Sequence, residues 1–299
     1  MHIMAISKVA VVGGTGNLGP AIVNGLLNGG FEVTVLSRSS SHQLDPRVKV
    51  QVADYNSSDS LTTALSGQDA VVNTLGVGVV PGEVHLRVLE AAHAAKVQRY
   101  IPSEFGSDTA NPLTAKLPVF GDKVAVIKKL EEIAAQDSTF SYTSIITGPF
   151  FDWGIEKTFL INLSGSSTSI YDGGDVPVSS TTLAGIGRAV AGTLQKAEET
   201  KNRHVYTANV QFTQNQVLQW SGKSDQIEKI PVKTEDLEAK AYEAIKQPTP
   251  DPHTFAKNLI LRAIFGGKFG GHFAKTDNEL LGLKELSESE IVDIVKKYV

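Results

Sequence analysis

Short apolar runs alternate with amphipathic segments along the first half of this 299-residue chain. The first run, Val9–Val12, is continuously apolar, which is typical of a strand buried on both faces of a sheet. Residues 18–27 then carry apolar side chains at helical spacing, and the Asn-Gly-Gly sequence at 28–30 ends that helix. A second apolar run occupies residues 32–36. The pattern therefore predicts a strand, a helix and a second, parallel strand.

The same alternation continues to about residue 150. Further strands are predicted at residues 48–53, 70–75, 99–102 and 140–147, and further helices at 60–65, 83–96 and 119–136. Strands that alternate with helices are typical of an α/β fold with a doubly wound parallel sheet of the Rossmann type. Ligands bind such sheets beyond the carboxyl ends of the strands, so the loops that follow the strands are expected to share one crevice.

The alternation weakens in the second half of the chain. Residues 182–194 and 201–207 predict one more helix and strand of the main sheet, whereas the Pro-Thr-Pro-Asp-Pro sequence at 248–252 predicts a rigid linker. An amphipathic helix is expected at 287–298. We therefore predict a cofactor-binding domain at residues 1–153, to which 181–210 return, and a smaller, irregular substrate-binding or lid region at 154–180 and 211–299.

A glycine loop follows the first strand. Gly13, Gly16 and Gly19 have the spacing G-x-x-G-x-x-G where the strand meets the helix. Such glycines allow a sharp turn, close approach of the main chain to phosphate and close packing of the helix on the sheet, while the helix amides point at the anion. The loop predicts a dinucleotide site, and the alternative is an ordinary glycine-rich turn without a ligand. Its candidate contacts are Gly13, Thr15, Gly16, Asn17, Leu18 and Gly19.

The end of the second strand indicates which dinucleotide binds. NAD-binding units carry an acidic residue about twenty positions after the loop, but here residues 37–40 read Ser-Arg-Ser-Ser. Arg38 could pair with the 2′-phosphate of NADP, with Ser39 or Ser40 as a further donor, or it could be a solvated loop arginine. We therefore predict NADP(H) as the cofactor. The crevice formed by the strand ends, including residues 75–78, adds the cofactor-binding candidates Asp54, Leu75, Gly76, Ser103, Pro149 and Phe151.

Two residues are candidates for acid–base catalysis. Lys123 lies in the middle of the apolar stripe of its predicted helix, where an ammonium group is costly without a partner or a task. Its stem could carry the charge to the surface, whereas a desolvated lysine has a lowered pKa and can shuttle protons. Glu104 follows the strand predicted at 99–102 and is expected at the mouth of the crevice. It could be an acid, a base, the partner that keeps Lys123 charged, or a plain rim carboxylate.

Other side chains are weaker candidates. Aromatic residues gather just past the strand predicted at 140–147, where a substrate is expected to lie: Phe150, Phe151, Trp153 and Phe159. Tyr55, Thr147 and Tyr171 are weaker candidates for chemistry. His85 and His93 lie near or in the helix predicted at 83–96 and are expected to be structural or exposed.

Composition narrows the classes of function. The formal net charge of −4 and a pI near 6.0 give no bulk attraction for nucleic acid. The absence of cysteine excludes thiolate nucleophiles and disulfides, and the seven histidines lack metal-ligand spacing, so no metal is expected. No apolar stretch approaches the length of a membrane span. We therefore expect a cytoplasmic protein without nucleic-acid or membrane partners. Its expected ligand is a small aromatic molecule, and whether the protein forms a homodimer is left undecided.

Four features together resemble the atypical short-chain dehydrogenases, in particular the NmrA-like and isoflavone reductase-like group. They are the loop at 13–19, Asn-Thr-Leu-Gly at 73–76, Tyr-Ile-Pro-Ser-Glu-Phe-Gly at 100–106, and Lys123. The resemblance is clear over residues 8–153 and vague after residue 220. It implies NADPH held by the loop, Arg38 and the Thr74 segment, with Lys123 contacting the cofactor and assisting the nicotinamide and the substrate. It also implies a cleft between the sheet and a smaller C-terminal domain.

Two departures limit what the resemblance implies. Ordinary short-chain dehydrogenases carry a tyrosine four residues before the lysine, but this chain has Val119 there, so their tyrosinate mechanism cannot operate from that position. The C-terminal third departs from the plant reductases of the group, so their lignan and isoflavonoid substrates are not carried over. The extended version seen here is similar to fungal enzymes of secondary metabolism.

Three functions are compatible with these features. The first is an NADPH-dependent reductase that delivers hydride to an aromatic or alkaloid-like intermediate of secondary metabolism, such as an enone, imine or quinone methide. The second is an NmrA-like regulator that senses NADP(H), and the third is an acid-catalysed cyclase or isomerase that uses the same pocket with bound NADP. A regulator has no need of Lys123 or of an aromatic pocket, so we favour the reductase.

Overall fold

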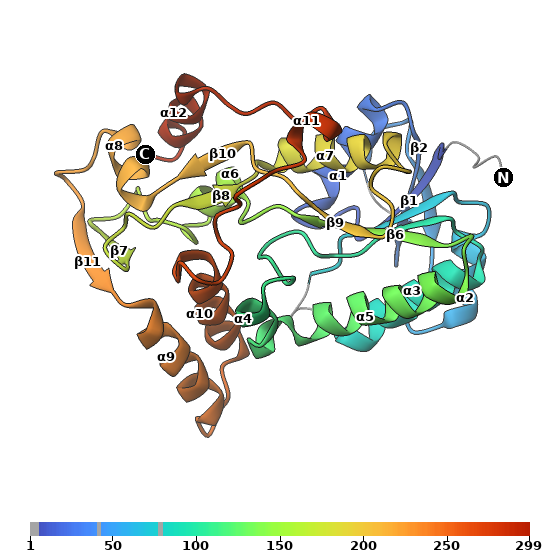
Figure 1. Cartoon of the computed structure of the whole chain (residues 1–299), viewed down its shortest axis with the longest axis horizontal. Helices are drawn as coiled ribbons and strands as arrows, with labels where there is room; N and C mark the ends of the chain where they lie inside the picture. The colour runs from blue at the N-terminus through green and yellow to red at the C-terminus, as the bar shows by residue number, and fades with distance from the viewer. Residues whose placement is uncertain (1–5, 41–42, 77–79) are drawn as a thin grey trace.

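Seven parallel strands form the central sheet, in the order β3-β2-β1-β4-β5-β6-β9 (Figure 1). The computed structural model describes residues 6–40, 43–76 and 80–299. The strands are β1 Lys8–Val12, β2 Glu32–Ser37, β3 Lys49–Val52, β4 Ala70–Asn73, β5 Arg99–Ile101, β6 Ser141–Ile146 and β9 Arg203–Tyr206. The order reverses between β1 and β4, which are neighbours, and this arrangement confirms the predicted doubly wound sheet.

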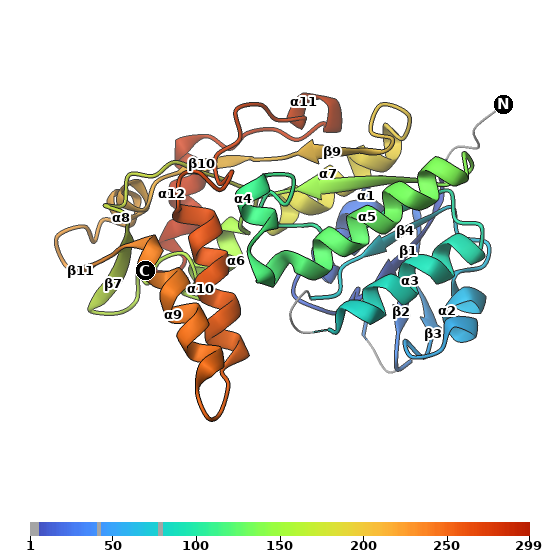
Figure 2. The same cartoon turned by 60° about the horizontal axis from the view of Figure 1, so that its bottom comes forward.

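Helices cover both faces of the sheet (Figures 1 and 2). One layer contains α1 Gly19–Asn28, α7 Leu183–Gln195 and α11 Asn278–Leu281, and the other contains α2 Ser58–Leu65, α3 Gly82–Ala94 and α5 Gly121–Gln136. Strand β1 shows why its sequence is apolar throughout. Val9 and Val11 pack with α1 and α7, whereas Ala10 and Val12 pack with α2, α3 and α5, and all four are fully buried.

Glycines bring α1 and α7 unusually close together. A Cβ atom on Gly25 would lie 2.2 Å from the carbonyl oxygen of Gly187, and one on Gly187 would lie 2.1 Å from the carbonyl oxygen of Ala21. Only glycine fits at this crossing, because real side chains do not approach backbone atoms so closely. Helix α7 is thereby fixed against the layer that contains α1, while β9 pairs with β6 at the edge of the sheet.

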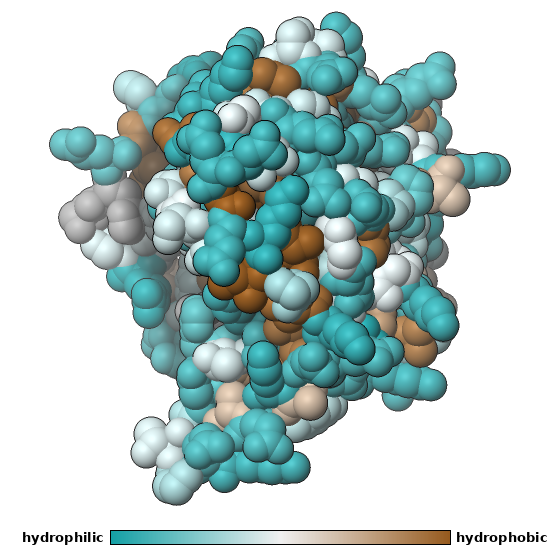
Figure 3. All heavy atoms as spheres, turned by 90° about the vertical axis from the view of Figure 1, so that its left-hand side faces the viewer, coloured by the Kyte–Doolittle hydropathy of each residue, from teal (hydrophilic) through white to brown (hydrophobic). Residues whose placement is uncertain are grey.

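A second region lies beyond the carboxyl end of β6 and has its own apolar core (Figure 1). Its two small sheets pair β8 with β10 and β7 with β11. Its elements are α6 Phe151–Glu156, β7 Ser167–Tyr171, β8 Val178–Ser180, β10 Val210–Phe212, α8 Gln214–Ser221, β11 Glu228–Val232, α9 Thr234–Lys246, α10 Pro252–Phe265 and α12 Glu288–Lys296. Seen from this end, the surface is largely hydrophilic, with apolar side chains near the middle of the face (Figure 3).

This second region is more regular than the sequence pattern predicted. Helices α9 and α10 pack side by side and project away from the sheet (Figure 2). The Pro-rich sequence at 248–252 is the turn between them rather than a linker between domains, and Pro252 begins α10 behind the capping side chain of Asp251. Helix α9 escaped prediction because its surface is mostly polar, with Leu237 and Ala241 as its buried apolar residues.

The segment between β5 and β6 differs from the prediction in two ways. The helix predicted at 119–136 is divided into a 3₁₀ turn, η1 Pro118–Phe120, and α5, which begins at Gly121. A short helix, α4 Pro112–Ala115, precedes them and was not predicted. The residues of η1 pack against α9 and α10, so this segment joins the sheet domain to the second region.

Within the described ranges, no helix is both long enough and apolar enough to cross a membrane. Within those ranges, no group of three or more His, Cys, Asp or Glu side chains is arranged to hold a metal ion.

Candidate active site

The strand order reverses where β1 and β4 lie side by side, and the loops after these strands flank this point. The backbone amide and the hydroxyl group of Thr74 both donate to the carbonyl oxygen of Val12, each at 2.8 Å. The Asn-Thr-Leu-Gly segment is therefore fixed against the start of the glycine loop. The predicted crevice loop 75–78 is described to Gly76, which is exposed, and its remaining residues lie outside the described ranges.

The glycine loop has the geometry that its sequence predicted. Gly13 has a φ of +84°, and a Cβ atom on it would lie 2.9 Å from the hydroxyl oxygen of Thr74. A Cβ atom on Gly19 would lie 2.3 Å from the carbonyl carbon of Gly14, so this glycine lets α1 start directly against the strand. Gly16 is exposed and its amide closes the turn by donating to the carbonyl oxygen of Gly13 at 3.0 Å.

The amino end of α1 faces out from this loop without a local anion. Leu18, at the N-cap position, is buried and offers no side-chain hydrogen bond, and the first turn contains no acidic residue. Thr15 and Asn17 are exposed beside it. The first amides of a helix carry partial positive charge and need acceptors, so this end of α1 suits a phosphate group.

Strands β2 and β3 bring three cofactor-binding candidates, Arg38, Ser39 and Asp54, to the same edge of the sheet. Arg38 and Ser39 follow β2 and are exposed. Asp54 follows β3, is also exposed, and accepts a hydrogen bond from the amide of Asn56 at 2.9 Å. Between them, Tyr55 donates its hydroxyl group to the carbonyl oxygen of Leu36 at 2.8 Å. Burial raises the pKa of Tyr55 to about 12, so this phenol is a neutral support of the edge rather than a base.

Lys123 lies on α5 with its ammonium group inside the protein. Its exposed fraction is 7%, and Nζ donates to the backbone carbonyl oxygen of Glu104 at 3.0 Å. Burial lowers the pKa of Lys123, and the charge of Glu104 opposes that shift. The alternative in which this stem carries its charge to the surface is therefore wrong. The ammonium is held by a turn that follows β5, on the same edge of the sheet as the glycine loop.

Glu104 is buried, and the expectation that it lies at the mouth of the crevice, or on its rim, was wrong. Its exposed fraction is 1%, and its carboxyl group accepts a hydrogen bond from the hydroxyl group of Thr109. Gly106, in the same turn, takes a φ of +142°, which side chains disfavour. Burial raises the pKa of Glu104, while Lys123 and Thr109 lower it. The carboxyl group is thus a buried electrostatic partner of Lys123.

Ser103 connects two of the loops at this edge. Its hydroxyl group donates to the carbonyl oxygen of Leu75 at 2.8 Å, and the amide of Leu75 donates to the side-chain oxygen of Asn73 at 3.0 Å. The segments after β4 and β5, which carry two of the motifs singled out from the sequence, are therefore joined by hydrogen bonds.

His85 lies beside the candidate site, which the sequence analysis did not predict. Its exposed fraction is 3%, so the alternative of an exposed histidine was wrong, and its Nδ1 atom lies 3.5 Å from the side-chain nitrogen of Asn73. The helical spacing of the sequence could have predicted this burial. His85 precedes Val88 and Leu89 by three and four positions and therefore shares their buried stripe. His93, in contrast, is half-buried and pairs with Asp137.

The aromatic residues after β6 divide into two groups. Phe151 is fully buried and packs against Phe212 with ring centroids 5.3 Å apart, so it belongs to the core of the second region. Phe150 and Trp153 are half-buried, with ring centroids 6.3 Å apart, and Trp153 also packs near Phe159. The weaker candidates Thr147 and Tyr171 are buried, as is Pro149.

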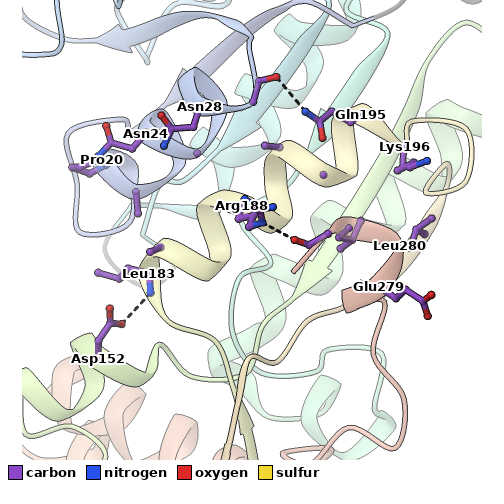
Figure 4. Close-up of a pocket in the computed structure, with 18 of the residues that line it drawn as sticks. Pro20, Asn24, Asn28, Asp152, Leu183, Arg188, Gln195, Lys196, Glu279 and Leu280 are labelled. Carbon is purple, nitrogen blue, oxygen red and sulfur yellow. Dashed lines mark hydrogen bonds between the residues drawn. The ribbon is translucent and has the colours of Figure 1, made fainter. Parts of the chain in front are cut away.

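A hollow of about 920 Å³ lies elsewhere, along α1, α7 and α11 (Figure 4). Asn17 and Asp152 are at its border, but none of Lys123, Glu104 and Arg38 lines it. Its walls are tied by local hydrogen bonds, such as that from the side chain of Gln195 to the carbonyl oxygen of Gly29 (Figure 4). The hollow and the predicted site therefore share Asn17, a candidate cofactor contact, but not the candidate catalytic residues.

Comparisons with known proteins identify the family and agree with the fold. The profile of the NmrA-like family matches residues 5–271. Oxidoreductase aprR of Aspergillus flavus is 38% identical over 216 residues, which are 71% of each chain. The solved structure of AtPrR2 with NADP+ and (+)pinoresinol has a TM-score of 0.77 at 22% identity and covers 99% of this chain and 100% of that one. Leucoanthocyanidin reductase with NADPH from Vitis vinifera has a TM-score of 0.74 at 20% identity and covers 97% and 99%. The resemblance predicted from the motifs is confirmed.

Proposed function

This chain belongs to the NmrA-like family, and on that premise we propose that it is an NADPH-dependent reductase. The proposed substrate is an aromatic or alkaloid-like intermediate of secondary metabolism that carries an enone, an imine or a quinone methide. The observation that carries this proposal is the burial of the Lys123 ammonium at the sheet edge that also bears the glycine loop. An oxidoreductase among its relatives and reductases among its structural neighbours support the assignment.

The residues at the sheet edge fit NADPH. The exposed loop and the uncapped start of α1 would hold the pyrophosphate, and Arg38 would pair with the 2′-phosphate. Gly13 fits because the space beside its Cα is filled by Thr74. When bound there, NADPH would supply the hydride for the reduction.

Lys123 would supply the proton that a reduction of this kind needs. Hydride addition to an enone, imine or quinone methide leaves negative charge or a basic atom on the substrate, which an ammonium group can stabilise and protonate. Burial lowers the pKa of Lys123, and this eases the release of its proton. The carbonyl oxygen of Glu104 fixes the direction of Nζ, and the charge of an ionised Glu104 opposes the lowering of the Lys123 pKa.

We propose that residues 154–180 and 211–299 contribute the substrate side of this crevice. Phe150 and Trp153 stand at the junction with part of each ring exposed, where they can contact an aromatic molecule. The main apolar core of this region is formed by its own side chains, so its surface can vary without loss of the cofactor site.

The experiment is a turnover assay of the purified chain with NADPH and a panel of enones, imines and quinone methides. We expect one NADPH consumed per reduced product, and loss of that activity in Lys123→Ala. Consumption of substrate without consumption of NADPH would instead show a cyclase or isomerase. Equal affinity for NADP+ and NADPH without any turnover would show a regulator, and either result overturns the proposal.

A further inference from the structure

A small cavity lies between α3 and α5, directly beside the Lys123 ammonium group. Its volume is about 10 Å³. One water molecule needs a cavity of roughly 10–15 Å³ together with two to four polar partners. Five of the six residues that line this cavity are polar: His85, Ser103, Glu104, Asp122, Lys123 and Val126. The cavity therefore has the size and the lining of a site for a single water molecule.

The tautomer of His85 follows from its neighbour. The side-chain oxygen of Asn73 accepts from the amide of Leu75 at 3.0 Å, so its amide nitrogen is the atom directed at Tyr100 and at Nδ1 of His85. An amide nitrogen can only donate, so Nδ1 must accept and the proton of the neutral ring lies on Nε2. Burial also lowers the pKa of His85, which favours the neutral ring.

The Nε2–H group of His85 then lacks an acceptor. Nε2 is buried and has no hydrogen-bond partner within residues 6–40, 43–76 and 80–299. A buried N–H group without an acceptor costs roughly 1–3 kcal/mol, so native proteins rarely leave one. The cavity that His85 lines offers space for the acceptor.

Asp122 connects this cavity to solvent. Its residue is exposed, yet its side chain reaches the start of α3, because a Cβ atom on Gly82 would lie 2.4 Å from its carboxyl carbon. Ser103 already donates its hydroxyl proton to Leu75, so its oxygen is left as an acceptor on the cavity side. A water molecule here would meet a donor at His85, an acceptor at Ser103, and Lys123 and Asp122 on either side.

We propose that this cavity holds one water molecule, positioned by His85, through which Lys123 recovers its proton from solvent at Asp122. The proposal rests on the reductase function above. After an N–H bond of Lys123 has broken to protonate the product, a proton of the water forms a new N–H bond. The water regains its proton from solvent through the carboxylate of Asp122. The net change is one proton taken from solvent, without any change of oxidation state.

In this scheme His85 is a positioning residue and not a proton carrier, because its Nδ1 faces a donor and cannot take up a proton there. His85→Leu removes the Nε2 donor, whereas His85→Gln restores an N–H group at a similar reach. His93→Leu is the matched control, because it removes a histidine from the same helix whose partner, Asp137, does not line the cavity.

We expect His85→Leu to lower kcat about tenfold, the effect of losing one hydrogen bond of ordinary strength, with little change in KM. Its solvent deuterium isotope effect should rise, because proton recovery becomes slower. His85→Gln should recover most of the rate, and His93→Leu should keep it. An unchanged kcat and isotope effect in a folded His85→Leu protein would overturn the proposal.

Two measurements on the protein without cofactor test the site independently of turnover. ¹⁵N NMR should show His85 as the neutral Nε2–H tautomer, and a crystal structure should show one water in the cavity that is lost in His85→Leu. An Nδ1–H tautomer or a dry cavity in the wild-type protein would overturn the inference, even if the protein is a reductase. If the water is present but no NADPH is consumed, the proposed function has failed and the scheme of proton recovery fails with it.

Discussion

The glycine loop and the Lys123 cluster lie at one edge of the same sheet, but they are built in opposite ways. The loop is made of backbone: Thr15 and Gly16 are exposed, and the groups that it would offer to an anion are those of turns and helix amides. The Lys123 cluster is made of buried charged side chains from α5 and the turn after β5. Cofactor binding can therefore rest on local geometry, whereas the proposed chemistry rests on groups that only tertiary packing brings together.

Because the loop and the Lys123 cluster are built differently, mutations in them should affect different steps. A change in the loop should act mainly on binding of the cofactor, because Lys123 and Glu104 lie on other segments of the chain. A change in the cluster should act mainly on turnover, because Lys123 and Glu104 are desolvated and their pKa values are shifted by burial. Four predictions test this division.

The largest effect is expected from Lys123→Met, which keeps an apolar stem of similar length and removes the ammonium group. Loss of a positioned acid typically costs about 10²–10⁴-fold in rate, so kcat should fall by at least about a hundredfold. The Kd for NADPH, measured by fluorescence titration, should change far less. An equal loss in both quantities would contradict the division between loop and cluster.

Gly13→Ala should have the next largest effect. The substitution forces alanine to a φ of +84° and places its Cβ atom 2.9 Å from the hydroxyl oxygen of Thr74. Strain of this kind costs about 1–3 kcal/mol, so the melting temperature should fall and the Kd for NADPH should rise. Gly30→Ala is a matched control, because Gly30 has a φ of +85° with no atom within 4 Å of its added Cβ. It should lower stability without affecting cofactor binding.

Arg38→Ala should weaken NADPH binding about tenfold, because a charge-assisted pair with the 2′-phosphate is lost. NADH lacks that phosphate, so its Kd should stay nearly constant, and the preference between the two cofactors should shrink. Arg47→Ala serves as a control, since this exposed arginine pairs with Asp45. If Arg38→Ala weakens the binding of NADPH and of NADH to a similar extent, Arg38 does not contact the 2′-phosphate.

The smallest effect is expected in the pH dependence of stability. Burial raises the pKa of Glu104 above its ordinary value of 4.5, so the folded protein binds a proton that the unfolded chain releases. This contribution to stability is complete below pH 4.5 and is lost as the pH rises through the folded-state pKa, with a slope of at most about 1.4 kcal/mol per pH unit.

Glu104→Gln should flatten that slope in urea unfolding measured at a series of pH values. The control Glu132→Gln changes an exposed residue of α5 and should leave the slope as it is. If the pH dependence of the free energy of unfolding persists in Glu104→Gln, the proton taken up on folding must bind to another group.

Most of the sheet could be predicted from the sequence, because each strand carries a local pattern of apolar residues bounded by polar or glycine-rich turns. The helices α9 and α10 could not, since α9 buries only Leu237 and Ala241 among its apolar residues and gains its stability from packing on α10. The same limit applied to His85. The sequence could have placed His85 on the buried stripe of α3. Its proposed role in positioning a water molecule depends on Asn73 and Lys123, which come from other elements.

The sequence by itself determined the geometry of the glycine loop, because turn geometry and helix dipoles are properties of a few consecutive residues. It also determined the family, through motifs at 13–19, 73–76 and 100–106. Only the tertiary structure decided that Glu104 points inward and that Lys123 is held by its backbone. The desolvation of a group depends on all the residues packed around it. These residues come from several segments, so no single segment of the sequence determines it.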